Sequence, residues 1–291
     1  MTQGLGSGST SGGRKYLDLL MTALVGVAVL LALIPLVLIV ADVVIQGLPA
    51  ISLSFLTNSP TPVNIPGGGI GPAIEGTAVI VGIATLISVP IGVGAGIFFS
   101  EWPESRLSTI SSFTNDVLAE FPSIVIGIFV YVLIVLATHS FSAIAGATAL
   151  SVIMIPIVAR TTEESLKIVP NTLREASMAL GISRWKTVIR IVISTGKNGL
   201  ATGILLAVAR AAGETAPLLL TALGSTFFLT GLFQPTAALP LLIYTYATSP
   251  YQVWHEQAWG AALILVAFML VLNLTVKLVI GRKFSEMRAE I

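Results

Sequence analysis

The chain has 291 residues, of which 55% are apolar and only 10% are charged, and its net charge is +1. Soluble domains carry about a quarter charged residues, so this composition excludes an ordinary water-soluble enzyme. The small net charge gives no reason to expect a nucleic-acid partner. Because the chain has no cysteine and two histidines, we expect no metal site and no cofactor. The mean hydropathy of +0.94 instead indicates a protein that crosses a membrane several times.

Six long apolar stretches predict membrane-spanning helices, because about 20 apolar residues are needed to cross a bilayer. They lie at 17–45, 76–99, 117–137, 142–159, 199–222 and 258–280. Membrane lipid offers the backbone no hydrogen-bond partners, so each stretch is expected to be helical and the fold all-α. Residues 1–16 are rich in glycine and serine and are expected to form a flexible tail, which leaves 17–291 as one transmembrane domain.

Lysine and arginine are distributed unevenly between the segments that join these stretches. The segments 46–75, 138–141 and 223–257 contain neither. The segment 160–197 contains seven, namely Arg160, Lys167, Arg174, Arg184, Lys186, Arg190 and Lys197. Because basic residues are retained on the cytoplasmic side of a membrane, we expect this segment and both termini to be cytoplasmic.

Two short amphipathic helices are predicted inside the segment 160–197. Thr172 followed by Glu175 has the spacing of a capping box at the start of the first helix. Gly181 supplies a stop signal at its end, and Ser183 is suited to cap the second helix. We therefore expect a helix, a glycine corner and a second helix between the fourth and fifth spans.

The residues alone leave two explanations for these helices. Amphipathic helices with basic residues can lie in the membrane interface. A docking surface is favoured by the small side chains of the first helix, because they let another backbone approach closely. These small residues are Ala176, Ser177, Ala179 and Gly181.

The run from Glu175 to Ser194, EASMALGISRWKTVIRIVIS, resembles the EAA loop of ABC importer permeases. Glu175, Ala176 and Gly181 are in register with that signature, whereas Ser177 replaces its last alanine and Ser194 replaces its final proline. The resemblance implies that Glu175, Ala176, Ser177 and Gly181 belong to a coupling helix. In this family, that helix fits a groove on an ATP-binding subunit.

The chain lacks a nucleotide-binding loop of the Walker type. Such a loop has the pattern G-x-x-x-x-G-K-[ST], which cradles phosphate groups. The best match is Gly196–Lys197, but Asn198 follows it and no glycine lies five residues before it. We therefore expect no catalytic residue in this chain and a separate subunit that hydrolyses ATP.

Arg210 and Glu214 are ionisable residues inside the fifth apolar stretch, and they share a helical face because they are four residues apart. Arg210 lies about 20 Å along a helix from Lys197, well inside a hydrocarbon core of about 30 Å. A charge at that depth is expected to face protein or a water-filled path. Two explanations remain open. The pair is an ion pair that holds the helix in place, or the guanidinium binds a tetrahedral oxyanion whose proton is shared with Glu214.

The second apolar stretch is rich in small residues, including Gly92, Gly94 and Gly96. Membrane helices pack closely where small residues meet. We expect these glycines to mark a helix contact rather than a ligand site.

The segment 223–257 is expected to lie outside the cell and is rich in aromatic residues. They are Phe227, Phe228, Phe233, Tyr244, Tyr246, Tyr251 and Trp254. Aromatic residues are enriched both in protein interfaces and in the belt beside lipid headgroups, so the segment is expected to contact a binding protein or lipid.

Four motifs occur in the order GGIGPAIEGT, EFPSIVIGIF, EASMALG and RAAGETAPLLLTA. Together, over about residues 65–281, they resemble the PstA-type permease subunits of phosphate ABC importers. The resemblance implies a six-span type I importer permease in the cytoplasmic membrane of a prokaryote, in which Arg210 and Glu214 take part in phosphate passage. It also implies a PstC-type second permease, two ATP-binding subunits and an extracytoplasmic phosphate-binding protein as partners.

Three other functions are compatible with parts of the sequence. The same architecture serves for importing another oxyanion, such as molybdate or sulfate. An ion-coupled secondary carrier would show broken helices in two inverted halves, but Arg210 and Glu214 have no counterpart in the first half. A non-transporting membrane scaffold would leave these charges inside the membrane unexplained.

Overall fold

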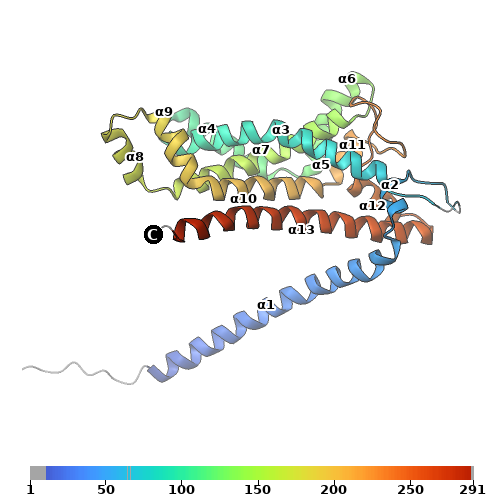
Figure 1. Ribbon diagram of the computed structural model, residues 1–291, viewed down its shortest axis with the longest axis horizontal. Helices are drawn as coiled ribbons and strands as arrows, with labels where there is room; N and C mark the ends of the chain where they lie inside the picture. The colour runs from blue at the N-terminus through green and yellow to red at the C-terminus, as the bar shows by residue number, and fades with distance from the viewer. Residues whose placement is uncertain (1–10, 64, 66, 290–291) are drawn as a thin grey trace, which may run out of the picture.

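A computed structural model describes residues 11–63, 65 and 67–289, with side-chain surroundings from residue 15 to residue 274 within these ranges. The described residues form a helical bundle, shown in Figure 1. Its α-helices are α1 (Ser11–Gly47), α2 (Leu53–Thr57), α3 (Gly71–Glu101), α4 (Arg106–Glu120), α5 (Ser123–Val130), α6 (Leu136–Thr138), α7 (Ala143–Lys167), α8 (Asn171–Ala179), α9 (Arg184–Thr187), α10 (Ile193–Ala212), α11 (Ala216–Thr221), α12 (Leu239–Ala247) and α13 (Gln252–Ala289). A 3₁₀ turn (Leu48–Ala50) and two π-helical turns (Tyr131–Val135 and Val188–Val192) complete the set.

The predicted all-α fold is confirmed. Among the described residues, 5 helices are long and apolar enough to cross a membrane, and the six predicted spans are reached when a bent pair of helices is counted as one span. The first span begins earlier than expected, because α1 already includes residues 11–16 of the predicted tail. Residues 1–10 of that tail lie outside the described residues.

The centre of the bundle is the contact between α3 and α7. A side chain on Gly92 would lie 2.7 Å from Cβ of Val158, and one on Gly96 would collide with the carbonyl oxygen of Ala159. A side chain on Gly94 would meet nothing within 4 Å. The prediction that glycines of this stretch mediate helix packing is therefore confirmed for Gly92 and Gly96 and wrong for Gly94, which lies on the opposite side of α3.

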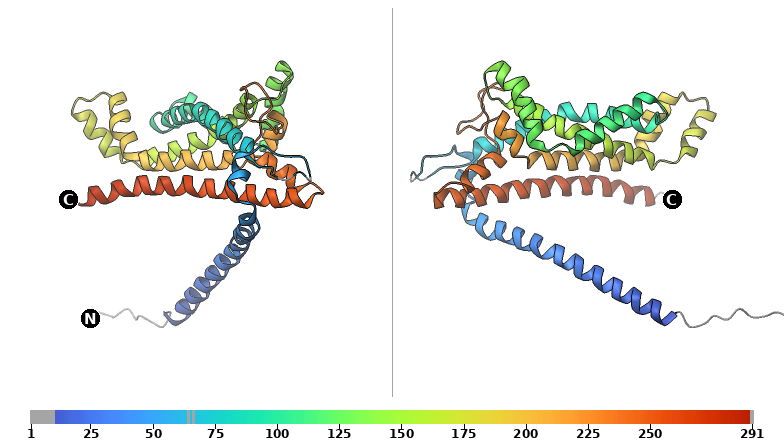
Figure 2. Two further views of the ribbon diagram at one scale, coloured as in Figure 1. Left: turned by 45° about the vertical axis from the view of Figure 1, so that its right-hand side comes forward. Right: turned by 180° about the vertical axis from the view of Figure 1, so that it is seen from behind.

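The long helices run along one axis, except for α1. Figures 1 and 2 show α13 lying along α10, whereas α1 leaves the bundle at an angle, and its apolar span is 0% buried. The start of α1, the end of α13 and helix α8 all lie at one end of the long axis. Helices α2, α6 and α12 lie at the other end. We call these the α8 end and the α12 end.

The third span was predicted as one straight helix over 117–137, and this is wrong. The chain turns by 102° between the helix 106–119 and the helix 123–138. Phe121 and Pro122 have extended backbone angles at the turn, since a proline disfavours helical geometry at the residue before it. The buried side chain of Asn115 holds the first arm by donating a hydrogen bond to the carbonyl oxygen of Pro156, at 3.3 Å.

The segment 160–197 contains the two predicted helices, α8 and α9, and the spans on either side of them extend further into the segment than predicted. Helix α7 continues to Lys167, stabilised by ion pairs within its last turns, such as Arg160 to Glu164 at 3.0 Å and Lys167 to Glu163 at 2.6 Å. The predicted second short helix is not separate, because α9 continues through the π turn into α10 as one span over 184–212. The apolar stretches of the sequence did not include these helix ends, because their residues are polar.

Candidate functional site

Helix α8 ends in a backbone motif that depends on Gly181. The amide of Gly181 donates to the carbonyl of Met178 at 2.9 Å, and the amide of Ile182 donates to the carbonyl of Ser177 at 3.2 Å. This pair of bonds is a Schellman motif, in which the residue after the helix takes a left-handed conformation. Gly181 has φ +78, so the predicted stop signal is confirmed. The motif fixes the corner between α8 and α9.

The start of α8 differs from the prediction. The helix begins at Asn171 after Pro170, and no side chain accepts a capping hydrogen bond there. The spacing of Thr172 and Glu175 therefore does not form a capping box, because Pro170 occupies the N-cap position, two residues before Thr172. Ser183 precedes α9 without a capping bond from its side chain.

The four residues predicted to couple the chain to an ATPase do not share one environment. Glu175, Ala176 and Gly181 are exposed. Ser177 is only 3% exposed, and its hydroxyl lies 2.8 Å from the hydroxyl of Thr187, also buried. Ser177 therefore joins α8 to α9. An alanine at this position would have no hydroxyl group to make this contact.

Large apolar side chains surround the exposed face of α8. Leu180 is 81% exposed and Trp185 is 63% exposed. Leu173 and Ile168 are exposed as well. An apolar group of this kind at the polar end of a membrane bundle is typical of a protein interface.

Arg210 and Glu214 lie elsewhere, at the end of α10. A side chain on Gly203 would collide with Thr161, so this part of α10 is level with the inner half of α7. Arg210 lies two turns further along α10, about 10 Å towards the α12 end. Its Nε atom is 3.4 Å from Oε1 of Glu214, and the two side chains are 56% and 16% exposed. Arg210 therefore lies in the last turn of the span 184–212 and Glu214 lies just beyond it, and the guanidinium is largely uncovered by its own chain.

The fifth span is interrupted directly beside this pair. Helix α10 ends at Ala212, and α11 begins at Ala216 with Pro217 in its first turn. The interruption begins at Gly213, ahead of the proline. Helix α11 then packs against α5, where a side chain on Gly127 would lie 2.7 Å from Cα of Pro217. A half-exposed guanidinium beside a helix break at the end of a span has the geometry to bind an anion.

The segment 223–257, which was predicted to lie outside the cell and is called the outer segment below, covers the α12 end and is tied to α3. The carboxylate of Glu75 accepts a hydrogen bond from the amide of Leu229 at 3.0 Å. The hydroxyl of Thr77 accepts one from the amide of Leu239 at 2.7 Å. A side chain on Gly76 would collide with the carbonyl of Ala237. The glutamate, glycine and threonine of the motif GGIGPAIEGT therefore fasten this segment, a role that sequence analysis did not find.

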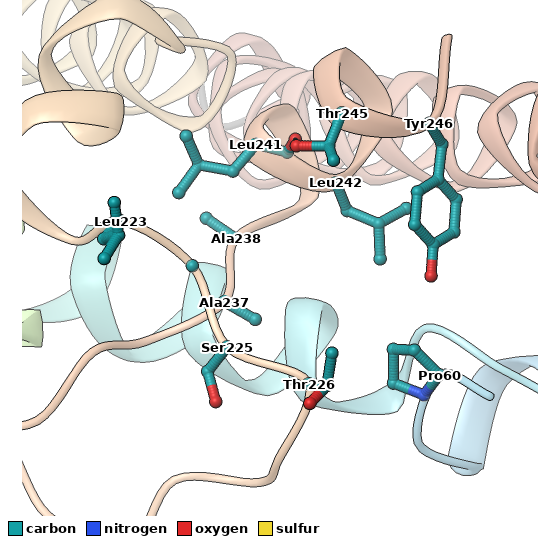
Figure 3. Close-up of a pocket in the computed structure, with 11 residues that line it drawn as sticks. Pro60, Leu223, Ser225, Thr226, Ala237, Ala238, Leu241, Leu242, Thr245 and Tyr246 are labelled. Atoms are coloured by element: carbon teal, nitrogen blue, oxygen red, sulfur yellow. The ribbon is translucent and has the colours of Figure 1, made fainter. Parts of the chain in front are cut away.

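A cavity of about 240 Å³ lies between α12 and the chain that precedes it, residues 223–238, with Pro60 at one side (Figure 3). Its walls are mainly apolar, with hydroxyl groups from Ser225, Thr226, Thr245 and Tyr246. Burial raises the pKa of the Tyr246 phenol, which therefore stays protonated at neutral pH. Tyr246 is only 7% exposed and stacks on Trp254 at 4.8 Å, so the prediction that it contacts a partner is wrong. Phe227 and Phe233 are 76% and 71% exposed.

Comparison with known proteins decides the family. Residues 88–283 match the family described as "Binding-protein-dependent transport system inner membrane component", a range that contains α8, Arg210 and Glu214. The chain belongs to this family. It is a multi-pass permease subunit of the ABC transporter class.

The permease is similar to proteins described as phosphate transport system permease protein PstA. The protein from Haemophilus influenzae is 44% identical over 93% of this chain and 96% of its own length. PstA 1 of Mycobacterium tuberculosis strain H37Rv is 42% identical over 85% of this chain and 82% of its own length. The probable PstA of Methanocaldococcus jannaschii is 39% identical over 91% of this chain and 94% of its own length.

Solved structures agree on the fold. The inward-facing MetNI methionine ABC transporter matches with a TM-score of 0.60 at 18% identity, covering 73% of the permease and 94% of that chain. An amino acid ABC transporter with histidines matches with a TM-score of 0.52, also at 18% identity, covering 73% of the permease and 92% of that chain. The similarity extends to the fold alone at this level of identity.

One contact at the α8 end of the permease was not predicted at all. Arg174 of α8 is paired with Glu101, which lies 73 residues earlier at the end of α3. In the sequence, both residues are simply charges beside an apolar stretch. Nothing in their spacing indicates that α3 and α8 meet. The predicted sites at α8 and at Arg210 are therefore separate, and Glu101 belongs with the first.

Proposed function

We propose that the permease is a transmembrane subunit of an ATP-driven importer of inorganic phosphate. The observation that carries this proposal is the 39–44% identity to proteins named as phosphate permeases, over more than nine-tenths of the chain. The other transmembrane subunit is a PstC-type permease, and an extracytoplasmic phosphate-binding protein delivers the substrate to the α12 end.

Arg210 and Glu214 form the phosphate-contacting part of the path in this proposal. The planar guanidinium donates two parallel hydrogen bonds to a tetrahedral oxyanion. Phosphate carries one or two protons at neutral pH, and Glu214 accepts a hydrogen bond from such a proton. Sulfate is fully deprotonated at neutral pH, so the same carboxylate repels it. The pair thereby favours phosphate over sulfate. A guanidinium without the carboxylate would not distinguish these two anions.

The permease itself hydrolyses no ATP in this proposal. Two ATP-binding subunits bind at the α8 end, where Glu175, Ala176 and Gly181 are exposed and Ser177 holds α8 in place. The α8 end faces the cytoplasm, which agrees with its seven lysine and arginine residues and with the position of both ends of the chain there. The permease thus lies in the cytoplasmic membrane of a prokaryote with both termini inside.

The test is uptake of radiolabelled phosphate into vesicles that contain the complete complex, with ATP enclosed and the binding protein outside. We expect uptake that depends on ATP and on the binding protein, and that excess sulfate or molybdate does not compete for. Efficient competition by molybdate or sulfate would assign the site to a different oxyanion. ATP-independent uptake driven by an ion gradient would instead assign the chain to the secondary carriers.

A further inference from the structure

Helix α8 has almost no apolar burial of its own. Of its nine residues, Asn171 to Ala179, only Ser177 is buried, and Leu173 and Met178 are exposed. Apolar packing beneath it comes from residues outside the helix, Leu166, Val169 and Val192. The orientation of α8 on the bundle therefore depends on polar contacts.

The strongest of these contacts joins α8 to α3. Arg174 donates from Nη2 and Nε to the same carboxylate oxygen of Glu101, at 2.8 and 3.0 Å. The side chains of Arg174 and Glu101 are 15% and 3% exposed. A carboxylate so thoroughly buried is stable only with its charge partner in place, so the pair holds the two helices together.

Arg174 also closes the end of α7. Its guanidinium donates to the carbonyl oxygen of Leu166 at 3.1 Å and to that of Val169 at 2.6 Å. The carbonyl of Leu166 also accepts a hydrogen bond from the amide of Val169 at 3.2 Å, in the turn that follows the end of α7 at Lys167. A single guanidinium therefore connects the ends of α3 and α7 with the start of α8.

A second fastening lies on the other side of the corner. The guanidinium of Arg184, at the start of α9, donates to the backbone carbonyl of Glu101. It also lies 4.9 Å from the ring centre of Trp102. The end of α3 is thus bound both by Arg174 of α8 and by Arg184 of α9. Along the chain, by contrast, α8 and α9 are connected to α7 and α10 and not to α3.

We propose that Glu101 and Arg174 are positioning residues that fasten α8 to α3, so that a displacement of α8 by the ATP-binding subunit moves α3 directly. The proposal rests on the proposed function, because it assumes that α8 receives the ATPase. Helix α3 packs along α7 through Gly92 and Gly96 and reaches the α12 end, where Glu75 and Thr77 fasten the outer segment. The pair therefore starts a continuous rigid connection from the ATPase to the outer side.

The first test measures whether α8 and α3 move as one body. The chain contains no cysteine, so cysteines introduced at the exposed residues Glu104 and Thr172 can be spin-labelled specifically. In the assembled complex we expect one narrow distance distribution between the labels, unchanged when ATP binds. In the Arg174→Gln background we expect a broad distribution. A wild-type distance that changes with ATP, or a variant distribution as narrow as wild type, would overturn the proposal.

The second test measures coupling. In vesicles, Arg174→Gln and Glu101→Gln should each lower the phosphate transported per ATP hydrolysed by about tenfold, within the usual range of coupling between sites, while ATP hydrolysis continues. Arg160→Gln is the control, because Arg160 pairs with Glu164 within α7 and not with α8. Unchanged coupling in both variants, or an equal loss in the control, would contradict the proposal.

Both tests can still be interpreted if a variant fails to assemble or if the complex does not transport phosphate. If Arg174→Gln does not assemble, Arg174→Lys takes its place, since it keeps the charge but loses the two-pronged contact. The label distance needs ATP but no transported substrate. A wild-type complex that fails to import phosphate would therefore count against the proposed function, whereas the label distances would still decide the role of Glu101 and Arg174.

Discussion

Arg210 and Glu214 lie 3.4 Å apart at the last turn of α10, where the fifth span is interrupted within the bundle. An ion pair between partners that are 56% and 16% exposed contributes little to stability when water reaches it. A pair retained only for stability would therefore be expected to be dispensable. Substitution of the pair is therefore a direct test of whether Arg210 binds the transported anion.

We expect Arg210→Gln to lower phosphate uptake strongly. A hydrogen bond to a charged group contributes roughly 1.5–3 kcal/mol, which corresponds to about a tenfold to hundredfold loss of uptake. Arg210→Lys should also be impaired, because an ammonium group lacks the planar fork. Uptake is measured in vesicles at equal amounts of assembled complex.

The double variant Arg210→Gln/Glu214→Gln separates the two explanations of the pair. If Arg210 only neutralised Glu214, removing both charges together would restore transport. We expect the double variant to remain inactive, because the anion has then lost its guanidinium. Near-normal uptake would show that the pair is structural and that phosphate is bound elsewhere.

Gly181→Asp should abolish the stimulation of ATP hydrolysis by the binding protein while the permease still folds. Aspartate tolerates the left-handed conformation of Gly181, and a side chain there meets no atom of the chain within 4 Å. The added charge therefore faces the docked ATPase, and any backbone strain from a side chain at this positive φ is shared by the control below. Gly67→Asp is the matched control at the α12 end, since Gly67 has φ +96 and equally open surroundings. Full stimulation in Gly181→Asp would exclude this corner from the docking surface.

Gly96→Ala should destabilise the bundle, whereas Gly94→Ala should not. The new methyl group on Gly96 collides with the backbone of α7 at Ala159, and overpacking of this kind costs about 1–3 kcal/mol. The methyl group on Gly94 meets nothing and favours the helix by up to about 1 kcal/mol. Thermal unfolding of both variants in the same detergent measures the difference. Equal melting temperatures would mean that α3 and α7 are further apart than described.

A photo-crosslinking residue at Phe233 should capture the phosphate-binding protein during transport. Phe233 is 71% exposed on the outer segment, and its neighbour Phe227 is similarly exposed. Tyr246 is the control, because it belongs to the same segment but is only 7% exposed and stacks on Trp254. Adducts from Phe233 are identified by mass spectrometry. Lipid adducts alone would assign the exposed aromatic residues to the membrane interface.

Cysteine labelling tests the orientation in the membrane. In intact cells, a membrane-impermeant maleimide should label Phe227→Cys and should leave Thr172→Cys unlabelled until the cells are opened. Both positions are exposed, and they lie at opposite ends of the bundle. The absence of cysteine from the natural sequence makes each label unique. The reverse pattern would place the α8 end outside and contradict the assignment of α8 to the ATPase.

The sequence determined the class of fold and the places where chemistry was expected. Long apolar runs lead to membrane helices whatever their neighbours are, because lipid leaves the backbone no other way to satisfy its hydrogen bonds. The corner at Gly181 was also predictable, since its left-handed backbone conformation is a local property of the chain. The position of Arg210 within a span followed from counting residues along a helix.

Only the tertiary structure decided which charges meet and where the helices end or bend. Glu101 and Arg174 are 73 residues apart, and their pairing depends on how α3 and α8 are arranged. Gly96 and Gly94 look alike in the sequence, but only Gly96 faces α7. Tyr246 is buried because α12 folds back against α13, which no local pattern indicates. Apolar periodicity indicates which side chains avoid water. Tertiary packing decides whether lipid or protein covers them.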